Sequence, residues 1–393
     1  MINKIFPKTP LAWRQLMKEK TRLVIAVSGI AFADILIFIQ MGFESALFDS
    51  AIKPHRNLQA DLVLINPQFQ TLFSVKSFSR ERLYQALSYE GVKSVSSIYI
   101  GTGQWRNRET RLDRSILVWG VDPATPGLKF PQVQANKDDL KQLNQVLFDE
   151  ASRPEYGEIG KIFRATGKFN TELNGKNLSV KGLFQNGASF ASDGNVVASD
   201  STFLQLFPTR TPEQIEVGLI TLKPGADLEK IKAELKIKLN PDPQNPFVEV
   251  GTPETFAQKE KDYWANGTGI GFIFGLGVIV GFIVGIVIVY QILYSDVSDH
   301  LPEYATLKAM GYTDNYLLGV LLQEALLLAA LGYLPALLLS FGIYQLTFTA
   351  TLLPIAMKLD RAINVFILTV IMCTISGAIA MQKLRSADPA DIF

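Results

Sequence analysis

The sequence is almost without cysteine and histidine, and these absences exclude several kinds of site. Cysteine occurs once, at Cys373, so no disulfide can form within the chain. Histidine occurs twice, at His55 and His300, which lie far apart in sequence. These few residues leave no zinc-type cluster and no credible Ser/His/Asp set. We therefore expect neither a metal site nor a catalytic residue in this chain.

Two further features are missing. The 38 basic and 37 acidic residues nearly cancel, and no basic run is interleaved with aromatics, so we expect no nucleic-acid partner. The phosphate-binding loop G-x-x-x-x-G-K-[ST] is also absent, since the Gly-Lys pairs that start at positions 160, 167 and 175 are followed by Ile, Phe and Asn. We expect this chain to bind no nucleotide cofactor.

Long apolar runs are present, and they dominate the two ends of the chain. A helix needs about 20 residues to cross the hydrocarbon core of a bilayer. Runs of this length cover residues 23–43, 267–294, 316–348 and 362–381. Residues 44–266 have the mixed composition of a water-exposed domain. The sequence predicts an integral membrane protein with four transmembrane α-helices and a large α+β extracytoplasmic domain inserted between helices 1 and 2.

The orientation follows from the basic segment 1–22, which carries Lys4, Lys8, Arg14, Lys18, Lys20 and Arg22. By the positive-inside rule this segment is cytoplasmic. The loop 295–315 and the tail 382–393 are then cytoplasmic, and the short loop 349–361 is periplasmic. The basic residues of the later loops favour the opposite orientation. We give the first span more weight because it usually determines the topology. Residues 11–22 fit either an amphipathic helix on the inner membrane face or a solvated basic anchor.

Within residues 44–266, alternating stretches predict strands over 61–65, 94–100, 115–120, 178–183 and 217–222. Helices are predicted over 137–148 and 227–239. The Gly-, Asn- and Ser-rich stretch 186–195 predicts a mobile hairpin or loop.

The membrane spans contain small and polar residues that indicate helix packing. Glycines recur at every fourth position in the second span, in two series: Gly267, Gly271 and Gly275, then Gly277, Gly281 and Gly285. This spacing favours close helix contact, although glycine is also common in membrane helices generally. Asp34 and Glu324 are predicted to be buried polar groups. For Asp34 we favour a hydrogen bond across the bundle over a proton relay. Pro335 predicts a kink in the third span.

The cytoplasmic loop 295–315 carries the signals of a short helix. Ser298 or Asp299 can cap its start, Pro302 and Glu303 suit its first turn, and Gly311 suits its end. Such a helix, held between two spans, is suited to transmitting force. A plain hairpin that only joins the spans remains the alternative.

Residues 303–311 (EYATLKAMG) with Gln323-Glu324-Ala325, and the tail 387–392 (ADPADI), resemble the signatures of the permease family that includes MacB, FtsX, LolC and LolE. Within that family the N-terminus and outer domain look most like cyanobacterial DevC permeases. Ala305 replaces the family's glycine, and the loop is acidic where relatives are often basic. MacB carries its own nucleotide domain, which this sequence lacks.

The resemblance implies a homodimeric permease whose inner helix docks on a separate, DevA-like ATPase, which holds ATP and Mg²⁺. It also implies a DevB-like periplasmic adaptor and a TolC-like outer-membrane channel. The outer region of this family forms two subdomains, so we expect a second lobe at about 155–200. The residues carried over to the ATPase contact are Pro302, Glu303, Tyr304, Ala305, Leu307, Lys308 and Gly311.

Three functions follow as hypotheses. The first is a permease of an ATP-binding-cassette exporter in the inner membrane that exports a lipid-like substrate such as a glycolipid. The second is an FtsX-type transmembrane regulator of a periplasmic enzyme, without transport. The third is a membrane-anchored scaffold without an ATPase. A co-purifying ATPase would exclude the third.

Overall fold

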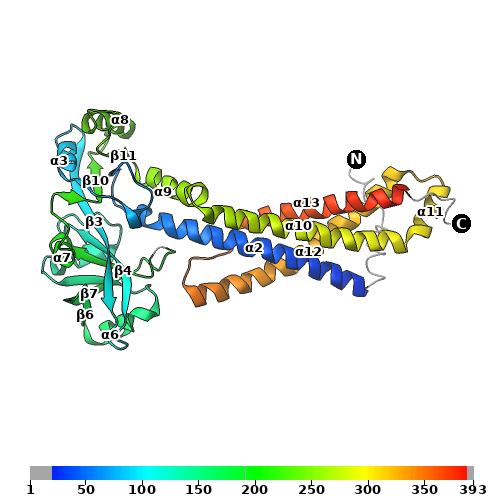
Figure 1. Ribbon diagram of the computed structural model, residues 1–393, viewed down its shortest axis with the longest axis horizontal. Helices are drawn as coiled ribbons and strands as arrows, with labels where there is room; N and C mark the ends of the chain where they lie inside the picture. The colour runs from blue at the N-terminus through cyan, green and yellow to red at the C-terminus, as the bar shows by residue number, and fades with distance from the viewer. Residues whose placement is uncertain (1–19, 191, 387–393) are drawn as a thin grey trace. The chain divides into compact units, whose positions relative to one another are not determined.

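The computed structural model describes residues 20–190 and 192–386 and separates into two compact units (Figure 1). Among the described residues, the membrane unit comprises 20–46, 269–351 and 355–386. The extracytoplasmic unit comprises Leu47–Thr268 and Leu352–Pro354. Most of the segment 11–22 and the tail motif 387–392 lie outside the described residues.

Four helices of the described chain are long and apolar enough to cross a membrane. They are α2 (Lys20–Arg56), α10 (Gly269–Asp299), α12 (Asp314–Thr351) and α13 (Leu359–Ser386). Helix α2 continues beyond residue 43, where we expected the span to end, because residues 44–56 contain no glycine and Pro54 falls in the last turn. Helix α12 runs through Pro335.

The membrane helices pack around small and aliphatic side chains. One cluster joins Ala26, Ile30 and Ala33 of α2 to residues of the other spans, among them Val289, Leu293, Leu321, Ala325, Met372 and Cys373. A Cβ on Gly281 would lie 3.1 Å from Ile37 of α2, and one on Gly277 or Gly285 would overlap Gln40 or Met372. This second series of glycines therefore lies where neighbouring side chains approach α10 most closely.

The first series of glycines lies differently. No described atom is within 4 Å of a Cβ built on Gly275, Gly271 is half-buried, and Gly267 falls in the extracytoplasmic unit. A helix contact through this series stays a prediction.

Asp34 is fully buried in α2. Thr369 of α13 donates a hydrogen bond from its hydroxyl to Asp34 Oδ1 at 2.8 Å. Because a polar group in a membrane helix needs a partner, this bond fixes the register between the two helices.

The extracytoplasmic unit is built on a nine-stranded mixed sheet in the order β11-β1-β10-β3-β4-β8-β5-β7-β6. Its strands are β1 (Leu62–Ile65), β3 (Val92–Arg106), β4 (Asp113–Val121), β5 (Gln145–Asp149), β6 (Phe169–Leu173), β7 (Lys176–Phe184), β8 (Asn195–Ser199), β10 (Val217–Leu222) and β11 (Glu249–Gly251). Strands β2 (Phe78–Ser79) and β9 (Gln214–Ile215) form a second, two-stranded sheet.

Short helices complete the extracytoplasmic unit. They are η2 (Leu72–Ser74), α3 (Glu81–Leu87), α4 (Pro131–Ala135), α5 (Lys137–Leu140), η3 (Pro154–Tyr156), α6 (Ile159–Thr166), α7 (Asp200–Leu206), α8 (Leu228–Leu239), α9 (Pro253–Asp262) and the π-helical turn η4 (Tyr263–Gly267). Neighbouring residues of β3 enter different cores: Tyr99 packs in one, and Ile98 and Ile100 pack in the other. This alternation places an apolar core on each face of the sheet.

Two expectations differ from this fold. The helix predicted over 137–148 is the short α5 followed by β5. Asn144, with φ of +63°, stands between them, and Val146 and Leu147 of β5 are completely buried. Residues 155–200, where we expected a second lobe, supply β6, β7 and β8 to the one sheet. The apolar runs of these strands are buried by neighbouring strands of that sheet and not by a core of their own.

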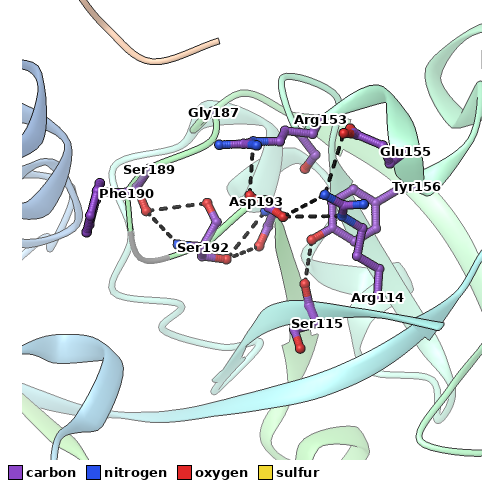
Figure 2. A network of polar contacts seen from close by, with 12 residues as sticks. Arg114, Ser115, Arg153, Glu155, Tyr156, Gly187, Ser189, Phe190, Ser192 and Asp193 are labelled. Carbon is purple, nitrogen blue, oxygen red and sulfur yellow. Dashed lines mark hydrogen bonds and ion pairs between the residues drawn. The ribbon is translucent and has the colours of Figure 1, made fainter. Parts of the chain in front are cut away.

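The loop before β8 is held at both of its ends. Asp149 of β5 accepts hydrogen bonds from the backbone of Asn186 (2.9 Å) and Gly187 (2.8 Å) and from the side chain of Asn195 (2.8 Å). Burial raises the pKa of Asp149, and these hydrogen bonds lower it. Arg114 and Arg153 converge on Asp193 (Figure 2). Their closest nitrogens lie 3.1 and 2.9 Å from its carboxylate oxygens.

Glu216, between β9 and β10, is completely buried in the extracytoplasmic unit. It forms an ion pair with Arg210 at 3.0 Å and accepts a hydrogen bond from the backbone of Ile100 at 3.1 Å. Burial raises the pKa of Glu216 to about 7, against the opposing effect of Arg210.

The two ends of the extracytoplasmic unit meet at a buried pair. His55, in the last turn of α2, lies 2.8 Å from Glu260 of α9, and neither side chain is exposed. Glu260 also accepts a hydrogen bond from the backbone of Leu72 at 3.0 Å. The segment that enters the unit and the segment that leaves it are therefore fastened together.

Candidate coupling site

The predicted cytoplasmic helix is α11 (Leu301–Ala309), which lies between α10 and α12. Only His300 separates it from α10. Gly311 follows it with φ of +95°, a left-handed conformation that suits a helix end, and the backbone of Tyr312 returns a hydrogen bond to Leu307 at 3.1 Å. The helix is thus joined to a membrane span by a short connection at each end.

The predicted contact residues divide between two faces of α11. Leu307 is half-buried and, with Leu301, packs against the core of the membrane unit. Pro302, Glu303 and Gly311 are exposed. Met310, which follows the helix, is also exposed, at 63%. Tyr304, Ala305 and Lys308 belong to α11, and their side chains lie outside the described part of the structure. One face of the helix is therefore anchored and the other is open to a partner.

A cluster of charged side chains lies beside the start of α11. Arg22 of α2 donates to Ser295 at 3.2 Å, lies 3.5 Å from Asp296 and forms an ion pair with Asp299. These three partners belong to α10. We name the group formed by Arg22, Ser295, Asp296, Asp299, His300 and Glu324 the basal cluster.

The basal cluster extends to α12. Glu324 is 1% exposed, and its carboxyl lies close to Asp296 and Arg22. The imidazole Nδ1 of His300 lies 3.1 Å from the carbonyl oxygen of Asp296. Three spans are therefore tied together at the root of α11, and the predicted buried group Glu324 is part of this junction.

Reasoning from the sequence did not find most of this cluster. The sequence assigns Arg22 only to the basic N-terminal segment and Asp296 only to the acidic loop, and it predicts Asp299 as a possible cap of the short helix. In the structure Asp299 is the last residue of α10. One signal was available: two acids end the second span, and a base stands at the matching end of the first span. Many charged residues lie at the ends of the spans, and only the packing of the helices shows that Arg22 is the partner of these two acids.

A groove of 870 Å³ runs along α2 and α10 next to the basal cluster. Its lining is polar at one end, with Lys20, Arg22 and Ser295, and apolar at the other, with Ile25 and Ile288. Such a lining suits a molecule that has both a polar and an apolar part.

Comparison with known families agrees with this division of the chain. Residues 23–238 match the model of the MacB-like periplasmic core domain, and residues 268–389 match the model of the FtsX-like permease C-terminal region. The chain belongs to the MacB/FtsX superfamily of permeases. It is therefore a multi-pass inner-membrane protein with the role of an ABC-type permease.

Solved structures resemble this permease at low sequence identity. The periplasmic region of MacB from Actinobacillus actinomycetemcomitans is 13% identical, with a TM-score of 0.38 over 52% of this chain and 94% of that one. The extracellular domain of the ABC-type transporter YknZ from Gram-positive bacteria is 13% identical, with a TM-score of 0.35 over 49% and 99%. A domain of a permease protein from Porphyromonas gingivalis is 12% identical, with a TM-score of 0.33 over 50% and 90%. Among curated proteins, none matches this sequence.

Proposed function

We propose that this permease relays the ATP-driven motion of a separate ATPase subunit to a periplasmic adaptor and thereby exports a lipid-like substrate. The observation that carries the proposal is α11, which is anchored on one face and open on the other. A DevC-like complex would supply a DevA-like ATPase, a DevB-like adaptor and a TolC-like channel. ATP and Mg²⁺ would be bound by the ATPase.

The geometry supports a rigid connection between the ATPase and the spans. A partner that presses on the exposed face of α11, at Pro302 and Glu303, acts on a helix joined to α10 through His300 alone. The basal cluster links α10 to α2 and α12 at that point. A displacement of α11 would therefore move three spans together.

The proposed substrate class rests on the groove between α2 and α10. A glycolipid has a polar head and apolar chains, and the groove has a polar and an apolar end. The outward-facing Gly275 supports the proposal of a homodimer, because small residues on a membrane helix allow a second helix to approach closely.

Reversing the charge of the exposed face of α11 tests this function. We expect Glu303→Lys, or a deletion within residues 302–311, to abolish stimulation of the ATPase by the permease in nanodiscs. Glu229→Lys on α8, which makes the same charge change on an exposed side chain of the other unit, serves as the control. Both variants should insert into the membrane normally.

Two outcomes would contradict the proposal. Unchanged stimulation in the α11 variants would remove this helix from the coupling path. Normal ATPase coupling with no lipid export, together with a co-purifying periplasmic hydrolase, would favour the FtsX-type regulator.

A further inference from the structure

Three arginines surround a small notch at one end of the extracytoplasmic sheet. Arg106 ends β3, and Arg108 and Arg111 lie in the turn between β3 and β4. The cavity between them has a volume of 220 Å³. We name it the arginine notch; its remaining lining comes from β6 and β7, through Asn170, Thr171, Glu172 and Asn177.

The lining of the arginine notch has an excess of positive charge. Three guanidinium groups face one carboxylate, that of Glu172, so the net charge of the lining is +2. Arg106 lies 3.5 Å from Glu172, and both side chains are more than 40% exposed. Within residues 20–190 and 192–386, Arg108 and Arg111 form no ion pair, and the buried Nε of Arg106 has no hydrogen-bond acceptor. The notch is therefore ready to receive an anion.

The turn that carries these arginines is held in one conformation. Asn107 is 5% exposed, and its side-chain oxygen accepts hydrogen bonds from the backbone of Glu109 (2.8 Å) and Thr110 (3.1 Å). Its side-chain nitrogen donates to the backbone of Glu155 at 2.9 Å. Arg111 has φ of +61° and donates from its backbone to Asn107 at 2.9 Å. A fixed turn lowers the entropy lost when a partner binds.

We propose that the arginine notch binds acidic side chains of a partner polypeptide. The planar guanidinium group matches a carboxylate through two parallel hydrogen bonds, and the carboxamide of Asn170 or Asn177 can donate a further one. Leu112, beside Arg111 in the same turn, is 70% exposed and gives a peptide an apolar contact that an inorganic anion could not use. The acids of the turn, Glu109 and Asp113, do not line the notch.

Binding of a defined acidic peptide tests this inference. The probe is a fluorescein-labelled peptide of alternating leucine and glutamate, titrated by anisotropy onto the full chain in phosphatidylcholine nanodiscs. We expect the Arg108→Glu/Arg111→Glu variant to bind it at least about tenfold more weakly at low ionic strength, since like charges in contact repel. Arg108→Lys/Arg111→Lys should show a smaller loss, because lysine keeps the charge without the paired geometry.

The matched control is Lys230→Glu/Lys236→Glu on α8, an equal charge reversal at exposed positions. Helix α8 lies at the other end of the domain from α6 and β6 (Figure 1). We expect this control to change the affinity less than about twofold, because charges far from the bound peptide interact with it only weakly through water. Unchanged thermal unfolding of each variant would show that the fold is intact.

Several results would overturn the inference. One is equal binding by the notch variant and the control. Another is equal affinity for a peptide in which glutamine replaces glutamate. Displacement of the peptide by equimolar inorganic phosphate would reduce the notch to a simple anion site, and notch-dependent binding of phosphatidylglycerol vesicles without peptide binding would assign it to lipid. None of these results bears on the coupling proposal, because the arginine notch does not include α11.

Discussion

Replacing Arg22 gives the most direct test of the basal cluster. We expect Arg22→Gln to destabilise the membrane unit far more than Asp299→Asn, although both remove the same ion pair. The reason is burial: the side chain of Asp296 is 8% exposed, whereas that of Asp299 is 53% exposed. Arg22→Gln takes the positive charge away from buried carboxyls, and Asp299→Asn removes only a solvated partner.

The expected magnitudes differ accordingly. Removing one partner of a buried charged pair costs about 3–5 kcal/mol, whereas an exposed pair contributes about 0–1 kcal/mol. For a unit of this size 1 kcal/mol shifts the unfolding temperature by roughly 2–4 °C. Arg22→Gln should therefore lower this temperature by at least about 6 °C, and Asp299→Asn by at most about 4 °C. Arg22→Lys, which keeps the charge, should lie between them.

The only cysteine of the chain provides the assay. Cys373 is fully buried in the membrane unit, so a thiol-reactive fluorogenic dye labels it only when this unit opens. Labelling is followed during heating of the protein in nanodiscs, and ATPase stimulation is measured in parallel. Equal unfolding temperatures for Arg22→Gln and Asp299→Asn would refute the argument from burial. Full ATPase stimulation in Arg22→Gln would show that the cluster has no part in coupling.

Two further predictions concern the interiors of the two units. The pKa of Glu216 is raised from 4.5 to about 7 in the folded chain. Between these two pH values the folded chain keeps a proton that the unfolded chain loses. The free energy of unfolding therefore falls by about 3 kcal/mol as the pH rises from 4.5 to 7. Glu216→Gln removes this pH dependence, so the unfolding temperature of the variant minus that of the wild type should rise from pH 5 to pH 8. Unfolding is followed by the fluorescence of Trp105 and Trp119. A difference that stays constant with pH would contradict the raised pKa of Glu216. In the membrane unit, Gly281→Leu should clash with Ile37 and lower the temperature of Cys373 labelling, whereas Gly275→Leu should leave it unchanged. Equal effects of the two leucines would argue against the observed packing of α10.

The sequence predicted those features that depend on local pattern. Apolar length was enough to place the four membrane helices, and the combination of Pro302 and Gly311 was enough to place α11. It failed where a segment's structure depends on distant partners. Residues 145–149 became a strand because β7 and β8 lie on either side of them. The end of α2 could not be predicted either. The length of an apolar run indicates where the membrane span ends, and the helix can continue beyond that point.

The candidate site divides in the same way. The exposed face of α11 follows from its own residues, while the basal cluster joins positions 22, 296 and 324, which are far apart in the chain. A single sequence contains no record of such long-range pairs. The interaction of Arg22 with Asp296 became visible only once the helices were packed.

The buried pair of His55 and Glu260 has a consequence for how such a chain can vary. The first and last segments of this domain are held together. A domain with its two ends close together can be inserted between two helices without forcing those helices apart. Loops of the domain can lengthen, or its core can be replaced, while the distance between the two chain segments that connect it to the membrane helices stays the same. The extracytoplasmic unit could thus diverge in size and sequence while the four membrane helices stay unchanged.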